Sequence, residues 1–246
     1  MIEPTGPGDL SPTNHMKSYL NPLGLAAIGL ALSIAATPAR AVNVTVDSGA
    51  TWLAFMNVKE LNNTPVFGSS WGVADATATF SGSGSGSTIT LGVNSIGDPN
   101  PFWYTPSGGP GAAGNKIMEA VVYVEDASLI GQSVTFSGTV LSNTFTSAHT
   151  SIAFIRDFAP DFSSFVEATT ALAPGNFTIT LATDPTPGRH VQYGFITTGA
   201  NVWITDAAAA GTAVVTAASA VPEPSSYAAL GGLAALAFVG LRRRRA

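Results

Sequence analysis

Apolar and polar residues alternate with a period of two over much of the chain between residues 42 and 220. In residues 133–140 valine and phenylalanine alternate with serine and threonine, and residues 177–182 repeat this pattern. Such alternation is typical of a strand with one buried face. Segments with similar residue types predict further strands at 42–46, 51–58, 74–80, 87–93, 117–125, 191–195, 201–205 and 212–216.

Turn signals separate these segments, as at Pro174-Gly175, Asp184-Pro185 and Asp98-Pro99. No stretch longer than about ten residues shows helical periodicity ahead of the apolar C-terminal segment. We therefore predict an all-β fold, an antiparallel β-sandwich with jelly-roll-like character, over residues 42–206. Residues 207–220 either supply its last strand or begin a stalk.

Two irregular segments interrupt the strands. Residues 81–87 alternate serine and glycine, which predicts a long flexible loop between two strands. Residues 97–115 contain four prolines around Phe102, Trp103 and Tyr104. A loop of this length is unusual in a compact domain and often has a function.

The N-terminal region has the pattern of a secretory signal peptide over residues 16–41. A lysine precedes an apolar run, and the segment ends in a small-x-small site with Ala39 and Ala41. Cleavage after Ala41 leaves Val42 as the mature N-terminus and implies export. Residues 1–15 are polar and proline-rich, so we interpret them as disordered or as a misassigned start, with translation beginning at Met16.

The C-terminal region begins with Val221, Pro222, Glu223 and Pro224, an extended linker because prolines two apart interrupt regular structure. The uncharged residues 227–241 predict one transmembrane helix. Its fifteen residues span roughly 22 Å, so bilayer thinning must make up the difference from a hydrocarbon core of about 30 Å. Four arginines follow and are expected to stay in the cytoplasm, stopping the helix in the membrane: Arg242, Arg243, Arg244 and Arg245.

These three elements, in this order over residues 221–246, resemble the PEP-CTERM sorting signal of Gram-negative bacteria. The resemblance implies recognition by an exosortase, a membrane-embedded processing enzyme. It also implies an intermediate anchored in the inner membrane and delivery to the cell surface or an extracellular polysaccharide matrix. It says nothing about what the exported domain does.

Composition and charge exclude several classes of protein. The chain of 246 residues is 46% hydrophobic and 10% charged, which excludes disorder through high charge. It has no cysteine, so disulfides, thiolate zinc sites and cysteine nucleophiles are excluded. Residues 42–220 hold four basic and twelve acidic residues and no basic cluster, so we expect no nucleic-acid partner.

Residues 132–206 also resemble, more loosely, the carbohydrate-binding jelly rolls related to galactose-binding-like domains. In those domains a glycine commonly precedes an aromatic strand, and the tryptophan that usually follows this glycine is replaced here by Phe177. The resemblance therefore implies a sandwich fold more than it implies a particular ligand. It is carried by residues 134–138, 172–178, 191–195 and 202–206.

Sugar binding requires exposed aromatic faces beside hydrogen-bonding side chains. Phe102, Trp103 and Tyr104 are therefore candidate glycan contacts, with Trp71 and Trp203 as alternatives. The other interpretation is that these rings fold back to cap the end of the core.

No catalytic set is visible. Two carboxylate pairs, Asp157 with Asp161 and Glu125 with Asp126, can be named for hydrolysis, but the sequence does not place either pair across a cleft. His149 and His190 stand in no metal-binding motif, and we expect surface or turn positions for them. Four aspartates could supply calcium ligands, but they do not have the regular spacing of a calcium-binding loop, so we expect no metal and no cofactor. These aspartates are Asp98, Asp126, Asp184 and Asp206.

The sequence thus predicts an exported protein that is sorted through its C-terminal signal and has a structural or adhesive role within exopolysaccharide. A carbohydrate-binding module is the alternative function, and a polysaccharide-acting hydrolase is a third.

Overall fold

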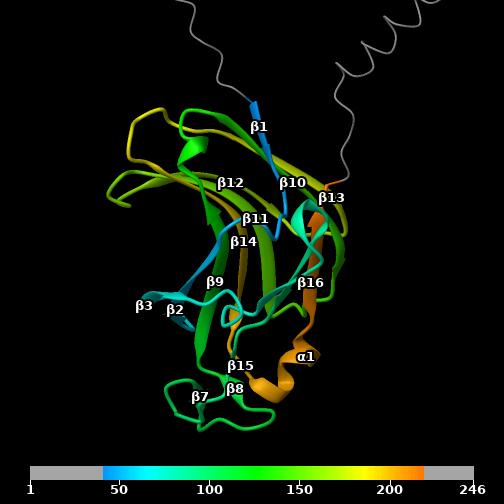
Figure 1. Cartoon of the computed structure of the whole chain (residues 1–246). Coiled ribbons are helices and arrows are strands. Elements are labelled where there is room, and N and C mark those ends of the chain that lie inside the picture. Colours follow the sequence, from blue (N-terminus) through cyan, green and yellow to red (C-terminus); the bar gives the residue numbers. More distant parts are fainter. Residues whose placement is uncertain (1–40, 219–246) are drawn as a thin grey trace, which may run out of the picture. The chain divides into compact units, whose positions relative to one another are not determined.

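The computed structural model describes residues 41–218, which form a β-sandwich (Figure 1). In its first sheet, sheet A, β10 pairs with β13 along one edge and with β1 and then β16 along the other. The strands of sheet A are β1 (Ala41–Val44), β4 (Ala78–Ser81), β5 (Thr88–Gly92), β10 (Ser133–Asn143), β13 (Gly175–Ala182) and β16 (Thr212–Ala217).

The second sheet, sheet B, has the strand order β12-β11-β14-β9-β2-β3, and all its pairs are antiparallel. Its strands are β2 (Trp52–Glu60), β3 (Pro65–Trp71), β9 (Lys116–Glu125), β11 (His149–Phe158), β12 (Phe165–Ala171) and β14 (His190–Ala200).

Short elements complete the domain. Two parallel residue pairs join β6 (Ser95–Ile96) to β15 (Val202–Trp203), and β7 (Tyr104–Thr105) pairs with β8 (Ala113–Gly114). The helical turns are η1 (Gly84–Gly86), η2 (Ala127–Leu129), η3 (Ile204–Asp206) and α1 (Ala207–Ala210). Within residues 41–218 no helix is long and apolar enough to span a membrane.

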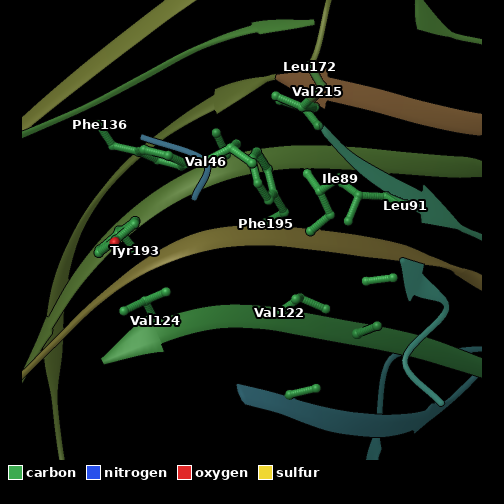
Figure 2. Packing of buried hydrophobic residues seen from close by; sticks show 14 of the residues in the cluster. Val46, Ile89, Leu91, Val122, Val124, Phe136, Leu172, Tyr193, Phe195 and Val215 are labelled. Atoms are coloured by element: carbon green, nitrogen blue, oxygen red, sulfur yellow. The ribbon is translucent and has the colours of Figure 1, made fainter. Parts of the chain in front are cut away.

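The core lies between the two sheets and takes the inward-facing residues of both (Figure 2). Phe136 of β10 contacts Tyr193 and Phe195 of β14, with ring centroids 5.3 and 5.4 Å apart. Trp52 of β2 contacts Phe80 of β4, with ring centroids 5.2 Å apart. Aromatic contacts of this kind add to the free energy gained by burying apolar area, so they bind one sheet to the other.

The prediction of an all-β sandwich is confirmed, and each predicted strand overlaps an observed one. The assignment to a jelly roll stays a prediction. β3, β11 and β12 were not predicted, and the pairs β1–β10 and β6–β15 are parallel rather than antiparallel. Residues 212–217 form β16, which lies between β10 and β5 inside sheet A.

The outer faces of the two sheets differ. Sheet A carries hydroxyl side chains, with Thr135 hydrogen-bonded to Thr180 at 2.9 Å and Thr139 to Asn176 at 2.7 Å. Sheet B instead carries a second hydrophobic cluster on its outer face, formed around Val121, Phe154 and Ile196. A strand that is apolar on both faces is expected where something covers it, so the outer face of sheet B is the candidate binding face.

Several predicted features lie outside residues 41–218. These are the polar segment 1–15, the signal peptide apart from Ala41, the motif 221–224, the helix 227–241 and the arginines 242–245.

Candidate functional site

A groove of about 560 Å³ runs over the outer face of sheet B. This volume lies within the usual range for small-ligand sites. A second hollow, about 610 Å³, lies beside β3 and the turn after it, but it is more open and is lined mainly by small and polar residues. The groove is lined by Phe55, Asn57, Ser70, Glu119, Val121, Tyr123, Glu125, Arg156, Phe158, Phe162, Phe165 and Gln192.

Strand register sorts the outer face into rows that cross the strands. One apolar row joins Ile152, Ile196, Val121 and Phe55. The next row places Gly194 between Phe154 and Tyr123. In both rows a residue of β14 pairs with residues of β11 and β9, so the floor of the groove is built from non-adjacent segments of the chain.

A charged row borders this floor, in the order Glu167, Arg156, Gln192 and Glu125 across four strands. Arg156 Nε donates to Glu167 Oε2 at 2.9 Å, and its guanidinium lies over the ring of Phe154 at 5.0 Å. Gln192 Nε2 donates to Glu125 Oε2 at 2.8 Å. The polar groups of this row therefore hold one another in place before any ligand arrives.

At the other side of the floor, Glu119 is held in the same way. Its two carboxylate oxygens accept from Asn57 Nδ2 at 3.0 Å and from Lys59 Nζ at 2.6 Å. A carboxylate has about four acceptor sites. Glu119 thus retains acceptor capacity toward the groove.

Three phenylalanines form one wall beyond the charged row. Phe158 contacts Phe165 at 5.0 Å and Phe162 at 5.5 Å between ring centroids. Phe162 stacks on the imidazole of His190 at 4.0 Å, and His190 Nδ1 donates to Glu125 Oε1 at 2.7 Å. Phe162 and Phe165 remain 52% and 46% exposed, so their rings present apolar surface at the rim.

Phe162 has a backbone conformation that is rare for its residue type. Its φ is 58°, in the left-handed region, where a bulky side chain is strained. The turn between β11 and β12 enforces it, because Asp161 Oδ1 accepts from both the amide and the hydroxyl of Ser163. These two hydrogen bonds also lower the pKa of Asp161 below its ordinary value.

Tyr123 places a hydroxyl in the groove. Within residues 41–218 this hydroxyl has no hydrogen-bond partner. Burial, and secondarily the negative charge of Glu125, raises the pKa of Tyr123 above its ordinary value. The hydroxyl therefore stays protonated at neutral pH and can both donate and accept.

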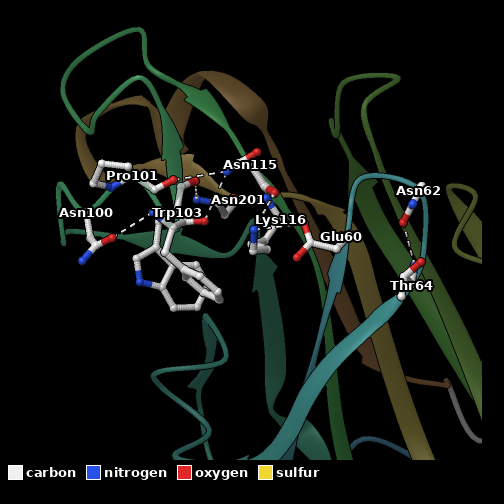
Figure 3. Close-up of polar contacts among 10 residues, drawn as sticks. Glu60, Asn62, Thr64, Asn100, Pro101, Trp103, Asn115, Lys116 and Asn201 are labelled. Atoms are coloured by element: carbon white, nitrogen blue, oxygen red, sulfur yellow. Dashed lines mark hydrogen bonds and ion pairs between the residues drawn. The ribbon is translucent and has the colours of Figure 1, made fainter.

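The predicted aromatic loop has a different geometry (Figure 3). Tyr104 is 0% exposed, and its hydroxyl lies within hydrogen-bonding distance of two backbone carbonyls, those of Ile96 and Val202, so it has no face for a sugar. Trp103 packs against the core, and Phe102 meets it edge-to-face at 4.7 Å. The Lys116 ammonium lies 4.4 Å from the centroid of the Phe102 ring. Glycan contact at Phe102 and Trp103 stays a prediction.

Asn201 anchors this loop. Its Nδ2 donates to Trp103 O at 2.9 Å, and its Oδ1 accepts from the amide of Lys116 at 3.0 Å (Figure 3). Lys116 Nζ in turn donates to Glu60 Oε2 at 3.0 Å. The loop is thereby fixed to β9 and to the chain that follows β14.

The two alternative tryptophans are also packed. Trp203 meets Tyr104 edge-to-face at 5.4 Å and lies against Gly108, where a Cβ would come within 2.5 Å of the ring. Trp71 packs against the core, and its Nε1 donates to Ser69 Oγ at 3.0 Å. Both rings are partly buried, and Trp71 also lines the second hollow, beside β3.

The carboxylates named for hydrolysis have structural partners. Asp157 is 0% exposed and accepts from Arg189 Nε at 2.6 Å and from the amide of Asp184 at 2.7 Å. Asp161 caps its own turn. Glu125 belongs to the charged row of the groove, while Asp126 accepts from the amide of Ser128 and caps η2.

The expectation of surface or turn positions is wrong for His149. It opens β11 and is only 7% exposed, with its ring over Gly199 and its Nε2 3.0 Å from Ala200 O. The four aspartates named for calcium accept backbone amides of nearby turns or loops, at Asn100, Gly111, Ser128 and Thr186. Within residues 41–218 no three acidic or histidine side chains gather as a metal site.

Sequence reasoning missed most of the groove. The available signal was the continuous apolar run Ala120–Val124, together with Ile152–Ile155, because strands buried on both faces lose their alternation. Three phenylalanines also lie within eight residues of one another in the sequence: Phe158, Phe162 and Phe165. Without the β11–β12 hairpin, nothing placed these rings beside Glu125 and Tyr123.

Comparison with known protein families identifies a sorting motif at the C-terminal end of the chain. Residues 220–245 match the PEP-CTERM protein-sorting motif. No curated protein and no solved structure matches the chain. A motif of this kind implies processing by an exosortase and export, with membrane-associated sorting to the surface. The chain thus carries, directly after its β-sandwich, a PEP-CTERM sorting motif.

Proposed function

We propose that this protein is a surface or matrix component that has a structural or adhesive role within an exopolysaccharide layer. The observation that carries the proposal is the order of parts along the chain. The sandwich ends with β16 at Ala217, and the sorting motif begins at residue 220. An exosortase therefore meets its recognition segment immediately outside a folded domain, where a cut frees the domain whole.

The membrane step of this proposal rests on the sequence. Residues 227–241 carry no charge and are followed by four arginines, so they anchor the exported intermediate until it is processed. The acidic body then lies on the far side of the membrane, in contact with extracellular polymer.

The experiment replaces the core of the motif, Pro222, Glu223 and Pro224, by alanine in the full chain. We expect the variant to stay in the membrane fraction at full mass, while the parent protein reaches the surface or medium with a lower mass. Ser226→Ala is the matched control, because it changes the same segment but leaves Pro222, Glu223 and Pro224 intact. Equal surface delivery of the triple variant would contradict the proposal.

A carbohydrate-binding module is the second candidate function, and the groove on sheet B favours it. The groove combines aromatic rings with fixed amide and carboxylate acceptors, which is the chemistry that sugars require. We propose no catalytic step, since each carboxylate named for hydrolysis caps a turn or is held in an ion pair.

A further inference from the structure

We propose that the groove on sheet B binds a segment of neutral polysaccharide, with Phe162 and Phe165 as stacking platforms and Tyr123, Glu125 and Glu119 as hydrogen-bonding groups. This inference rests on the proposed surface role and names the ligand class of the protein. It assigns binding to the face of the sandwich rather than to the aromatic loop around Phe102.

Stacking is the first requirement. The apolar C–H face of a pyranose packs on a flat ring, and the exposed rings of Phe162 and Phe165 provide this surface at the rim. Phe158 supports both rings from below. His190 holds Phe162 by stacking at 4.0 Å, so one face of Phe162 is fixed against the domain.

Directional hydrogen bonding is the second requirement. The Tyr123 hydroxyl lacks a partner within residues 41–218, and it lies in the groove between the apolar floor and the charged row. Glu125 and Glu119 each accept two hydrogen bonds within the domain, which fixes their orientation. Sugar hydroxyls can donate to the remaining lone pairs without any rearrangement.

The charge of the groove selects against acidic polymers. Its ion pairs bring together Glu119, Glu125 and Glu167 with only two permanent cations, Lys59 and Arg156. Both cations are already paired with glutamates. A uronate would meet uncompensated like charge inside a body that is itself acidic, and like charges repel strongly where water is partly excluded. Neutral sugars meet no such penalty.

The strain at Phe162 is the independent observation. A phenylalanine at φ 58° destabilises the fold relative to asparagine or glycine, which tolerate this conformation. Strained residues of this kind concentrate at ligand-binding sites. Here the strain directs an aromatic ring to the rim of the groove, which a structural turn does not require.

The test uses the full chain, purified in mild detergent, and measures retardation in native gels that contain one polysaccharide each. The neutral probes are β-glucan, galactomannan and xyloglucan, and the acidic probe is alginate. We expect retardation by at least one neutral probe and none by alginate. Phe165→Ser and Phe162→Asn should each weaken binding about tenfold, which corresponds to about 1.4 kcal/mol.

Two further variants separate binding from folding. Phe102→Ser removes an exposed ring outside the groove and should leave binding unchanged. Tyr123→Phe retains the ring and should weaken binding several-fold. Phe162→Asn should melt at the same temperature as the parent or higher, so its loss of binding will not reflect unfolding.

The proposal would be overturned by the absence of retardation with every neutral probe, by stronger retardation with alginate, or by an equal loss of binding in Phe102→Ser. Dimer formation that Phe162→Asn abolishes would also overturn it, because the groove would then hold a second copy. Failure here is separable from failure of the proposed sorting, since the groove variants should reach the surface normally and the motif variant should bind normally once purified.

Discussion

Arg156 and Asp157 are consecutive residues of β11 whose side chains lie on opposite faces of sheet B. Arg156 pairs with Glu167 on the outer face at 2.9 Å, whereas Asp157 pairs with Arg189 at 2.6 Å and is fully buried. Successive side chains of a strand point in opposite directions. Two neighbouring charges thus belong to the groove on sheet B and to a buried ion pair, and neither neutralises the other.

Asp157→Asn should destabilise the domain strongly. The change removes the close carboxylate partner of the largely buried Arg189 guanidinium and leaves it only the more distant Asp184 carboxylate, at 3.9 Å; breaking such a pair costs about 3 kcal/mol. Denaturant unfolding followed by tryptophan fluorescence measures the loss. Glu167→Gln is the matched control on the exposed face and should cost about 0.5 kcal/mol. Equal losses in the two variants would show that the burial of Asp157 is not decisive.

Gly114→Ala should detach the loop of residues 97–115. A Cβ at this position would lie 1.8 Å from the carbonyl oxygen of Asn201, so β8 must move away from the chain after β14. We expect a loss of about 2 kcal/mol and faster proteolysis within the loop. Gly97→Ala, in the same loop with open space around it, should change neither quantity.

The domain should lose stability in strong alkali because of Tyr193. Burial raises the pKa of Tyr193 to about 12 from an ordinary value near 10. A raised pKa means that the folded chain keeps the proton longer than the unfolded chain. The stabilisation is therefore complete below pH 10 and is lost as the pH rises toward 12. Unfolding curves between pH 8 and 12 should show this fall, and Tyr193→Phe should reduce it by at most about 3 kcal/mol.

The mature protein should begin at Val42. β1 pairs in parallel with β10 from Ala41 opposite Ser133 to Val44 opposite Phe136. Cleavage after Ala41 retains the pairs from Val42 onward and leaves the strand in place. N-terminal sequencing of the exported protein checks this directly. A start beyond Val44 would remove β1 and contradict the expectation.

Strands with a visible alternation of apolar and polar residues were predicted, whereas β3, β11 and β12 were not. β10 and β13 expose threonine and serine on sheet A, so their alternation is visible in the sequence. β11 conceals its alternation, because Phe154 and Ile155 are both buried, one on each face of sheet B. β3 begins with a proline and contains a glycine, which an edge strand tolerates but a sequence pattern does not favour.

The candidate site was harder to predict than the fold. Its charged row joins Glu125, Arg156, Gln192 and Glu167 through register between strands far apart in the chain. No local pattern encodes that register, since it follows from the packing of the whole sheet. The sorting motif, in contrast, was easy to predict. Its chemistry is contained in one contiguous segment, and the sequence alone revealed it.

The position of β16 has a mechanical consequence. This strand leads into the sorting segment, and it lies between β10 and β5 with hydrogen bonds on both sides. The amide of Ala218 also donates to Thr45 Oγ1 at 3.2 Å, beside β1. A force applied along the axis of β16 would load the hydrogen bonds on both of its edges together, so they would have to shear at once rather than open one by one. The strand that ends the sandwich is therefore held against mechanical extraction by two neighbours.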